Sequence, residues 1–87
     1  MLKVSLTKDA RKFLDDLPAK QFRQIVLKIF DLMKDPRPHD SCPLKGFDYL
    51  RADCGEYRIV YRHDAECLYV VLVGKRNDDD VYKRLGR

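Results

Sequence analysis

The chain has 87 residues, 45% of them hydrophobic, which is the size and composition of one small globular domain. Its 18 Lys and Arg residues outnumber its 14 Asp and Glu residues, and the net charge of +4 suits a polyanionic partner. Cys42, Cys54 and Cys67 form no CxxC motif, which argues against a disulfide framework or a zinc site and favours reduced thiols in the cytoplasm. No long apolar run stands at the N-terminus, so neither a signal peptide nor a membrane span is expected.

The N-terminal third of the chain predicts a short strand followed by a helix. Leu2, Val4 and Leu6 alternate with polar residues, which is typical of a half-buried strand. Thr7 can then cap a helix over about residues 8–17. The inner face of this helix is expected to carry Ala10, Phe13, Leu14 and Leu17.

A second, longer amphipathic helix is predicted after Pro18, a residue that suits the first turn of a helix. It should end at Asp35, because the residue before Pro36 is driven out of the helical region. Its inner stripe is expected to consist of Phe22, Ile25, Val26, Ile29, Leu32 and Met33. The two helices should form a hairpin that covers one face of a sheet, with their apolar stripe packed in the core.

The middle of the chain predicts a loop and then a meander of strands. Three prolines within residues 36–43 indicate an extended loop. A strand over residues 47–52 should pair with a second one over 56–62, across a turn at 53–55. The third strand, residues 67–74, has no polar face, so it is expected in the middle of the sheet with both of its faces covered.

Beyond this buried strand the character of the sequence changes. Lys75 and Arg76 mark the rim of the sheet, where functional groups often stand on a rigid scaffold. A short terminal helix should follow, capped by Asn77, with acidic residues in its first turn and basic ones in its last, the order that the helix dipole favours. Those charged residues are Asp78, Asp79, Asp80, Lys83 and Arg84. Such a helix would fold Tyr82 back toward the end of the strand.

These elements together predict one domain over residues 1–87 of the α+β class. Its small antiparallel sheet should have about four strands, with the helices on one side of it. The N-terminal helical hairpin would cover one face, and the short helix would close the chain.

Three motifs follow one another along the chain: Leu44-Lys45-Gly46, the run GEYRIVY from Gly55, and VGKR from Val73 with Tyr82 six residues after Arg76. In this order they resemble the RelE/ParE superfamily of bacterial and archaeal toxins. The resemblance implies a RelE-like fold and a cytoplasmic toxin of a type II toxin–antitoxin module. RelE-type members are endoribonucleases that cleave mRNA in the decoding site of the ribosome, whereas ParE-type members inhibit DNA gyrase. The implied partners are therefore a cognate RelB-type antitoxin, the ribosome and mRNA, with operator DNA bound through the antitoxin and no cofactor or metal.

The resemblance also implies a set of site residues. The catalytic ones are Arg58, Arg76, Tyr82 and Arg51, and those that bind RNA phosphate are Lys45, Tyr49 and Lys75. Tyr49 and Arg51 stand where RelE-type enzymes often carry two lysines. Because arginine is a poor proton-transfer group but a good phosphate ligand, we expect the arginines to stabilise developing charge. Proton transfer is left to Tyr82, Tyr49 or Lys45, and Tyr82 can equally stack on a base.

Each of the three main residues also has a purely structural alternative. Arg58 can pair with Asp53 or Glu56, Arg76 can pair with the aspartates that follow it, and Tyr82 can fill the core. Three function classes follow: an mRNA endoribonuclease, a non-catalytic inhibitor of gyrase, and a member that has lost catalysis and survives as an antitoxin partner. The trio of Arg58, Arg76 and Tyr82 favours the endoribonuclease, and the absence of the two lysines keeps the gyrase inhibitor as the alternative.

Overall fold

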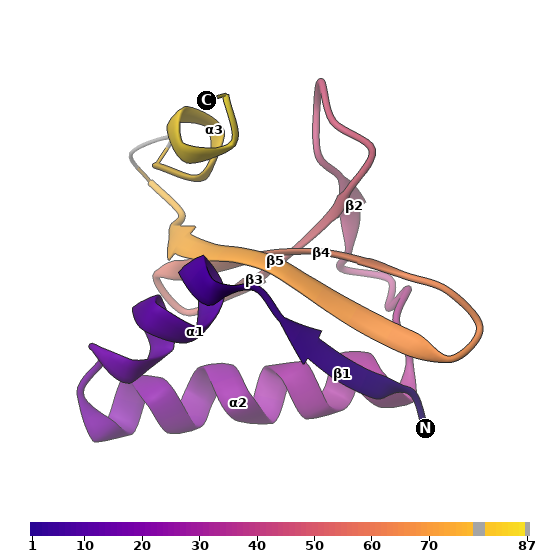
Figure 1. Ribbon diagram of the computed structural model, residues 1–87, viewed down its shortest axis with the longest axis horizontal. Coiled ribbons are helices and arrows are strands. Elements are labelled where there is room, and N and C mark those ends of the chain that lie inside the picture. The colour runs from indigo at the N-terminus through magenta and orange to yellow at the C-terminus, as the bar shows by residue number, and fades with distance from the viewer. Residues whose placement is uncertain (78–79, 87) are drawn as a thin grey trace.

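The computed structural model describes residues 1–77 and 80–86, and it shows a twisted sheet with helices on both faces (Figure 1). The chain begins and ends on opposite sides of this sheet (Figure 1). The described elements are β1 (Lys3–Leu6), α1 (Lys8–Asp15), α2 (Ala19–Lys34), β2 (Cys42–Pro43), β3 (Leu50–Cys54), β4 (Tyr57–His63), β5 (Cys67–Lys75) and α3 (Asp80–Leu85). The α+β class is confirmed.

The sheet is mixed, and within the described residues it has five strands in the order β1-β5-β4-β3-β2. Strands β2 to β5 pair antiparallel, as expected, but β1 lies parallel to β5, from Lys3 opposite Cys67 to Leu6 opposite Val70. The prediction of a small antiparallel sheet of about four strands is therefore corrected in two respects: β1 is parallel to β5, and the short strand β2 brings the number of described strands to five. The predicted interior position of β5 is confirmed, since β1 flanks it on one side and β4 on the other.

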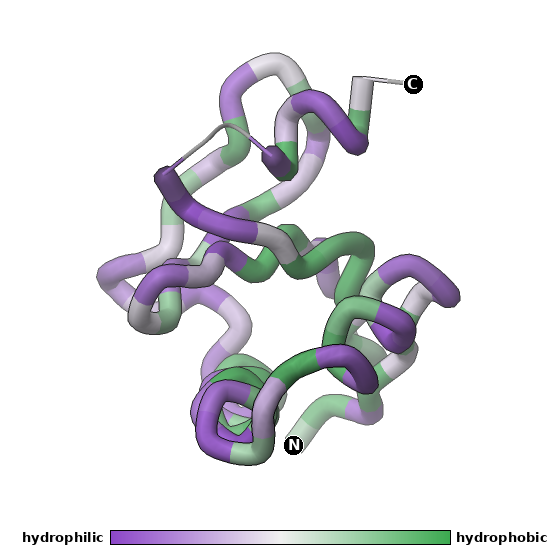
Figure 2. The backbone as a smooth tube through the Cα atoms, turned by 90° about the vertical axis from the view of Figure 1, so that its left-hand side faces the viewer, coloured by the Kyte–Doolittle hydropathy of each residue, from purple (hydrophilic) through white to green (hydrophobic). Residues whose placement is uncertain are grey.

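The two faces of the sheet carry separate hydrophobic cores. The hairpin core, between the sheet and the hairpin of α1 and α2, consists of Ala10, Leu14, Ile25, Ile29, Leu32, Leu50, Ala52, Ile59, Tyr61, Leu68, Val70 and Val73. The distal core, on the other face, consists of Leu44, Val60, Leu72 and Val81. Hydrophobic stretches (green) run through the middle of the molecule in Figure 2. Because α3 supplies Val81 to the distal core, it lies across the sheet from α1 and α2, and the expectation of helices on one side only was wrong for α3 (Figure 1).

The N-terminal helices begin as their sequence signals predict, and α2 also ends as predicted, whereas α1 ends at Asp15, two residues before the predicted end. The Thr7 hydroxyl accepts a hydrogen bond from the Ala10 N–H (3.1 Å) and donates one to the Val71 carbonyl (2.6 Å), which ties the start of α1 to β5. Pro18 precedes α2, and Asp35 leaves the helical conformation with φ −143° and ψ 96°. None of the described helices is long and apolar enough to cross a membrane.

Two strand boundaries differ from the prediction. The strand expected over residues 47–52 is β3 (Leu50–Cys54), because residues 44–49 form a loop instead. In this loop the Leu44 N–H donates to the Tyr49 carbonyl (2.9 Å), and Gly46 takes a positive φ of 87°, which favours glycine. The closed loop returns the chain beside β3, so residues 42–43, expected in an extended loop, pair as the short strand β2.

Some apolar side chains of β1 and α2 are more exposed than expected. Val4 and Leu6 of β1, predicted to be half-buried, are 40% and 37% exposed. Phe22, predicted on the inner stripe of α2, is 40% exposed, while Ile25, Ile29 and Leu32 are buried. The physical reason for the exposure of Val4 and Leu6 is that β1 is an edge strand, with no further strand beside it among the described residues.

Candidate functional site

Two predicted catalytic arginines converge on one carboxylate on the distal face of the sheet. Asp53 of β3 lies opposite Arg58 of β4, and Arg51 precedes Asp53 by two residues, so all three side chains share this face. Arg58 donates from Nε to Asp53 Oδ1 (2.8 Å) and from Nη2 to Oδ2 (3.4 Å). Arg51 Nη1 lies 3.7 Å from the same Oδ2. These residues form a partly exposed cationic cluster with Asp53 at its centre.

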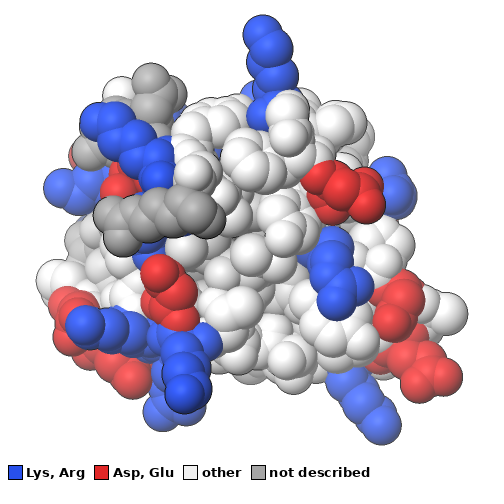
Figure 3. All heavy atoms as spheres, turned by 45° about the horizontal axis from the view of Figure 1, so that its top comes forward, with Lys and Arg blue, Asp and Glu red and all other residues white. Residues whose placement is uncertain are grey.

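Two tyrosines named by the sequence lie on the same face. Tyr49 and Tyr82 are half-buried and pack against the distal core. Tyr49 comes from the loop before β3, and Tyr82 comes from α3. Tyr49 also stacks on Phe47, with ring centroids 6.4 Å apart and planes 14° from parallel. Figure 3 looks toward the loop and α3 and shows an uncharged centre with basic and acidic side chains distributed around its margin. This face therefore carries aromatic rings and separate arginine side chains that can bind phosphate, rather than one continuous basic patch.

The position of Tyr82 depends on close packing between α3 and the end of β5. A Cβ at Gly74 would stand 2.6 Å from Asp80 Oδ2, 2.9 Å from Val81 Cγ1 and 3.0 Å from Arg84 Nη1. Contacts this short are not tolerated, so only glycine lets α3 approach the strand at this distance. Gly74 is also the register partner of Arg58, which brings α3 to the same part of the sheet as the cationic cluster.

Arg84 fastens α3 to the rest of the molecule, a role that the sequence analysis missed. Its Nη1 donates to the Val73 carbonyl (2.8 Å) and to Asp80 Oδ2 (3.0 Å), and its Nη2 binds Asp9 of α1. Its guanidinium also lies over the ring of Phe13, 5.4 Å from the centroid. The spacing of Asp80 and Arg84 by four residues was the available signal, and it pointed only to a pair within the helix.

The basic residues at the end of β5 separate. Arg76 is exposed directly after the strand, and its N–H donates to the Glu56 carbonyl (2.9 Å), which fixes the backbone there. Lys75 is the register partner of Tyr57, whose side chain packs against the hairpin core, so Lys75 points away from the distal face. Lys45 is exposed in the loop between β2 and β3. The structure thus groups Arg51, Arg58, Tyr49 and Tyr82 on one face, places Arg76 directly after β5, and leaves Lys75 apart.

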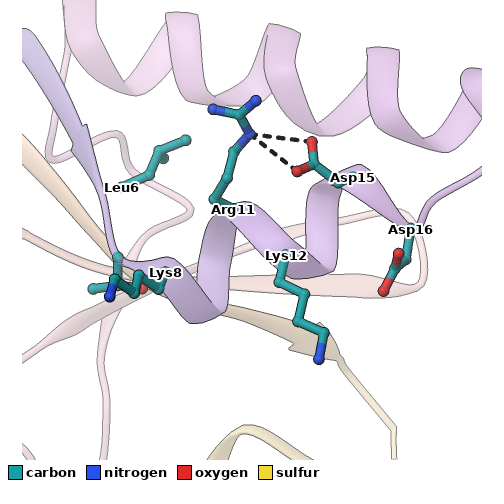
Figure 4. Close-up of a pocket in the computed structure, with 7 residues that line it drawn as sticks. Leu6, Lys8, Arg11, Lys12, Asp15 and Asp16 are labelled. Carbon is teal, nitrogen blue, oxygen red and sulfur yellow. Dashed lines mark hydrogen bonds and ion pairs between the residues drawn. The ribbon is translucent and has the colours of Figure 1, made fainter.

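The surface also has hollows, of which two lie outside this group and a third adjoins it. One of about 470 Å³ runs along α1 and contains the exposed pair of Arg11 and Asp15, 3.1 Å apart (Figure 4). A second, of about 270 Å³, is an apolar groove between β1 and α2, lined mainly by Val4, Leu6, Leu14, Phe22, Val26, Ile29 and Phe30. A third, of about 340 Å³, adjoins Tyr49 and is lined by Arg37, Arg62 and His63 among others. Within residues 1–77 and 80–86 no group of three metal-ligating side chains is placed to hold a metal ion.

Two potentially reactive groups serve the fold. Burial raises the pKa of the Tyr61 hydroxyl, which donates to the Pro36 carbonyl (2.7 Å) at the end of α2. Burial likewise raises the pKa of the Cys54 thiol, so this group stays protonated at neutral pH and is no candidate nucleophile. Both residues contact the hairpin core, across the sheet from the cationic cluster.

Comparison with known proteins places these features in context. The sequence model described as "ParE toxin of type II toxin-antitoxin system, parDE" matches residues 4–80. Among curated protein sequences, no match was found. The fold is similar to the toxin of the archaeal RelE–RelB complex from Pyrococcus horikoshii, with a TM-score of 0.76 and 25% identity over 88% of this chain and 97% of the other.

Two further solved structures have the same fold. One is the toxin–antitoxin complex RelBE2 of Mycobacterium tuberculosis, with a TM-score of 0.74 and 29% identity over 86% of this chain and 98% of the other. The second is the isolated RelE toxin of Escherichia coli, with a TM-score of 0.75 and 23% identity over 99% of this chain and 96% of the other.

Proposed function

The chain belongs to the ParE toxin family of type II toxin–antitoxin systems, within the RelE/ParE superfamily, and we propose that it is a ribosome-dependent endoribonuclease that cleaves mRNA in the decoding site. The observation that supports this proposal is the arrangement of the distal face. There Arg51 and Arg58 converge on one anionic group, and Tyr49 and Tyr82 lie on the adjoining core. A binding protein that acts by contact alone needs no such combination.

The proposed reaction is an intramolecular transesterification, in which the phosphoryl group moves from the 5′-oxygen of one nucleotide to the 2′-oxygen of the nucleotide before it. The 2′-oxygen loses its proton and attacks the adjacent phosphorus, the bond to the 5′-oxygen breaks, and the departing oxygen gains a proton. The products are a 2′,3′-cyclic phosphate and a free 5′-hydroxyl. Arg58, Arg51 and Arg76 stabilise the charge that develops on the phosphate oxygens, which guanidinium groups bind in bidentate fashion.

Proton transfer in this scheme falls to a tyrosine. Arginine stays charged at any physiological pH, so it does not serve as a general base. Tyr82 is half-buried on α3 beside the distal core, and Tyr49 contacts the same core from the loop before β3. We assign the proton transfer to Tyr82 first, because α3 packs directly on Gly74, the partner of Arg58.

The ribosome would supply what this small site does not. The cationic cluster can hold phosphate groups, but Arg51, Arg58 and Asp53 line none of the hollows described above, so the cluster by itself does not hold a nucleotide in line for attack. Positioning accounts for a large part of such barriers, up to about 7–11 kcal/mol in well-oriented reactions. Free RNA should therefore be a poor substrate, and rapid cleavage of naked mRNA at stoichiometric enzyme would contradict this expectation.

Primer extension on an mRNA in a purified translation reaction tests the proposed activity. We expect cuts inside codons that require ribosomes, and cleaved ends that carry a 2′,3′-cyclic phosphate. The Arg58→Ala variant should give no cuts, whereas Arg23→Ala, which removes an exposed arginine of α2, should cut like the parent. Absence of cuts by a folded parent protein that arrests growth would refute the proposal.

Inhibition of DNA gyrase remains the second candidate function, because Tyr49 and Arg51 stand where RelE-type enzymes often carry lysines. A supercoiling assay with purified gyrase distinguishes the two. Inhibition of supercoiling together with intact mRNA would favour the gyrase target, and the reverse result would favour the endoribonuclease.

The partner that we propose for control of the toxin is a small acidic antitoxin of the RelB type, as the toxins of the similar solved complexes bind. The edge strand β1 presents an open row of backbone groups, and the apolar groove lies beside it. An extended segment can add a strand there and place apolar side chains in the groove, while its acidic residues match the net charge of +4. A disordered segment that folds on binding suits such a surface.

Substitution in the groove tests this surface. Phe30→Glu should weaken co-purification with the antitoxin encoded beside the toxin, because Phe30 is 47% exposed and lines the groove. Glu substitution of Leu27, which is 55% exposed but does not line the groove, is the matched control. Equal binding by both variants would contradict the assignment of the groove.

A further inference from the structure

We propose that Asp53 occupies the phosphate-binding edge of Arg58 in the free protein and thereby limits the affinity of the distal face for RNA. This inference rests on the proposed function for its substrate, RNA, but it concerns Asp53, to which that proposal assigns no role in binding or catalysis. Asp53 would be the residue that keeps the affinity of the cationic cluster for free RNA low.

The geometry of the cluster is that of an anion receptor. Arg58 presents the Nε and Nη2 edge of its guanidinium to both carboxylate oxygens of Asp53, at 2.8 and 3.4 Å. This paired contact is the arrangement in which a guanidinium also binds two phosphate oxygens. Arg51 approaches the same carboxylate from β3 at 3.7 Å. A phosphate that takes this edge of Arg58 must therefore displace Asp53 or share the two guanidinium groups with it.

The position of Asp53 in the sheet makes this contact persistent. Its register partner across the strands is Arg58 itself, so the two side chains are held side by side by the pairing of β3 with β4. The side chain of Arg58 is only 14% exposed, whereas that of Asp53 is 32% exposed. Solvent and ligand thus reach the carboxylate more readily than the guanidinium, and an incoming anion meets the negative charge of Asp53 first.

The charge of Asp53 also lowers the attraction of the whole cluster for phosphate. Asp53 cancels one of the two positive charges that Arg51 and Arg58 supply within contact distance. Removing one unit charge about 4 Å from a bound phosphate, in a partly solvated site, should tighten binding about fivefold or more. One more effective phosphate contact should also steepen the dependence of log K on log salt by about 0.7 for a single strand.

The test measures binding of a fluorescent, single-stranded oligodeoxynucleotide, which has no 2′-hydroxyl and is not cleaved, by anisotropy at several salt concentrations. The main variant is Asp53→Asn, which keeps the shape of the side chain and removes its charge. The matched control is Asp31→Asn, which makes the same change on the exposed side of α2. Asp53→Thr, whose side chain suits a strand, replaces Asp53→Asn if the latter does not fold by circular dichroism.

The expected result is that Asp53→Asn binds about fivefold tighter with a steeper salt slope, that Asp31→Asn binds like the parent, and that the gain disappears in an Arg58→Ala background. A purely structural role for Asp53 would change the unfolding midpoint but not the salt slope. Equal or weaker binding by Asp53→Asn, an equal gain from Asp31→Asn, or no binding by any variant at low salt would overturn the inference. Because the probe is not cleaved, this result is independent of whether the toxin cuts mRNA on the ribosome.

Discussion

Addition of one methyl group at Gly74 should separate α3 from the sheet and so misplace Tyr82. In Gly74→Ala the new Cβ would stand 2.6 Å from Asp80 Oδ2 and 2.9 Å from Val81 Cγ1. Val81 is only 1% exposed and belongs to the distal core, so α3 cannot absorb the methyl group without a shift. Overpacking of this kind typically lowers the free energy of unfolding by about 1–3 kcal/mol. A shift of about 1 Å in a catalytic group can slow a reaction about 100-fold.

The effects of Gly74→Ala can be measured on stability and on activity. Urea unfolding should show a loss of about 1–3 kcal/mol, and amide hydrogen exchange at Val81 should accelerate more than exchange in β4. Ribosome-dependent cleavage should fall about 100-fold at a temperature where the variant is still folded. The matched control is Gly55→Ala, where a positive φ of 59° makes alanine unfavourable by about 1–2 kcal/mol but the nearest other atom lies 4.0 Å from the Cβ.

The Gly55→Ala control separates a loss of activity caused by lower stability from one caused by the displacement of α3. Gly55→Ala should lose a similar amount of stability and retain most of its activity, because α3 is not touched. If both variants lose activity in proportion to stability, the packing of α3 on Gly74 does not position a functional group. If Gly74→Ala cleaves at the parent rate and exchanges normally at Val81, the reasoning from the short contacts is wrong.

Three further predictions concern single side chains. Tyr82→Phe should slow cleavage by about 10²–10⁴-fold and change its pH dependence if the hydroxyl transfers a proton, whereas a silent Phe variant with an impaired Ala variant would show that the ring stacks on a base. Arg76→Ala should slow cleavage about 100- to 1000-fold with little loss of stability, because Arg76 is exposed after β5; full toxicity of this variant in a growth assay would reject its role. Hydrogen bonds from the Glu66 and Cys67 N–H groups hold the pKa of Asp64 below its ordinary 3.8, so its stabilising effect is present above pH 3.8 and is lost as the pH falls through the lowered value. The unfolding free energy of the parent should therefore fall more steeply in acid than that of Asp64→Asn, and parallel acid limbs in a urea series would contradict this.

The sequence alone determined the local elements of this protein, because their signals lie within a few residues of one another. Thr7 caps α1, Pro18 and Asp35 bound α2, and the alternation of Tyr57, Ile59 and Tyr61 assigns one face of β4 to the hairpin core. The hydrophobic run of β5 correctly predicted an interior strand. The motifs around Arg58 and Arg76 also led to the superfamily that the comparisons support.

The assembly of the site could not be read from the sequence, because it depends on pairings between distant residues. Side-chain alternation gives the face of a strand but not its neighbour, so the parallel pairing of β1 with β5, and the groove that it leaves beside α2, appeared only in the fold. The sequence offered Asp53 and Glu56 as equal partners for Arg58, and the register of β3 against β4 selected Asp53. The face that α3 covers was likewise decided by contact, since only the absence of a side chain at Gly74 lets Val81 and Arg84 reach the end of β5.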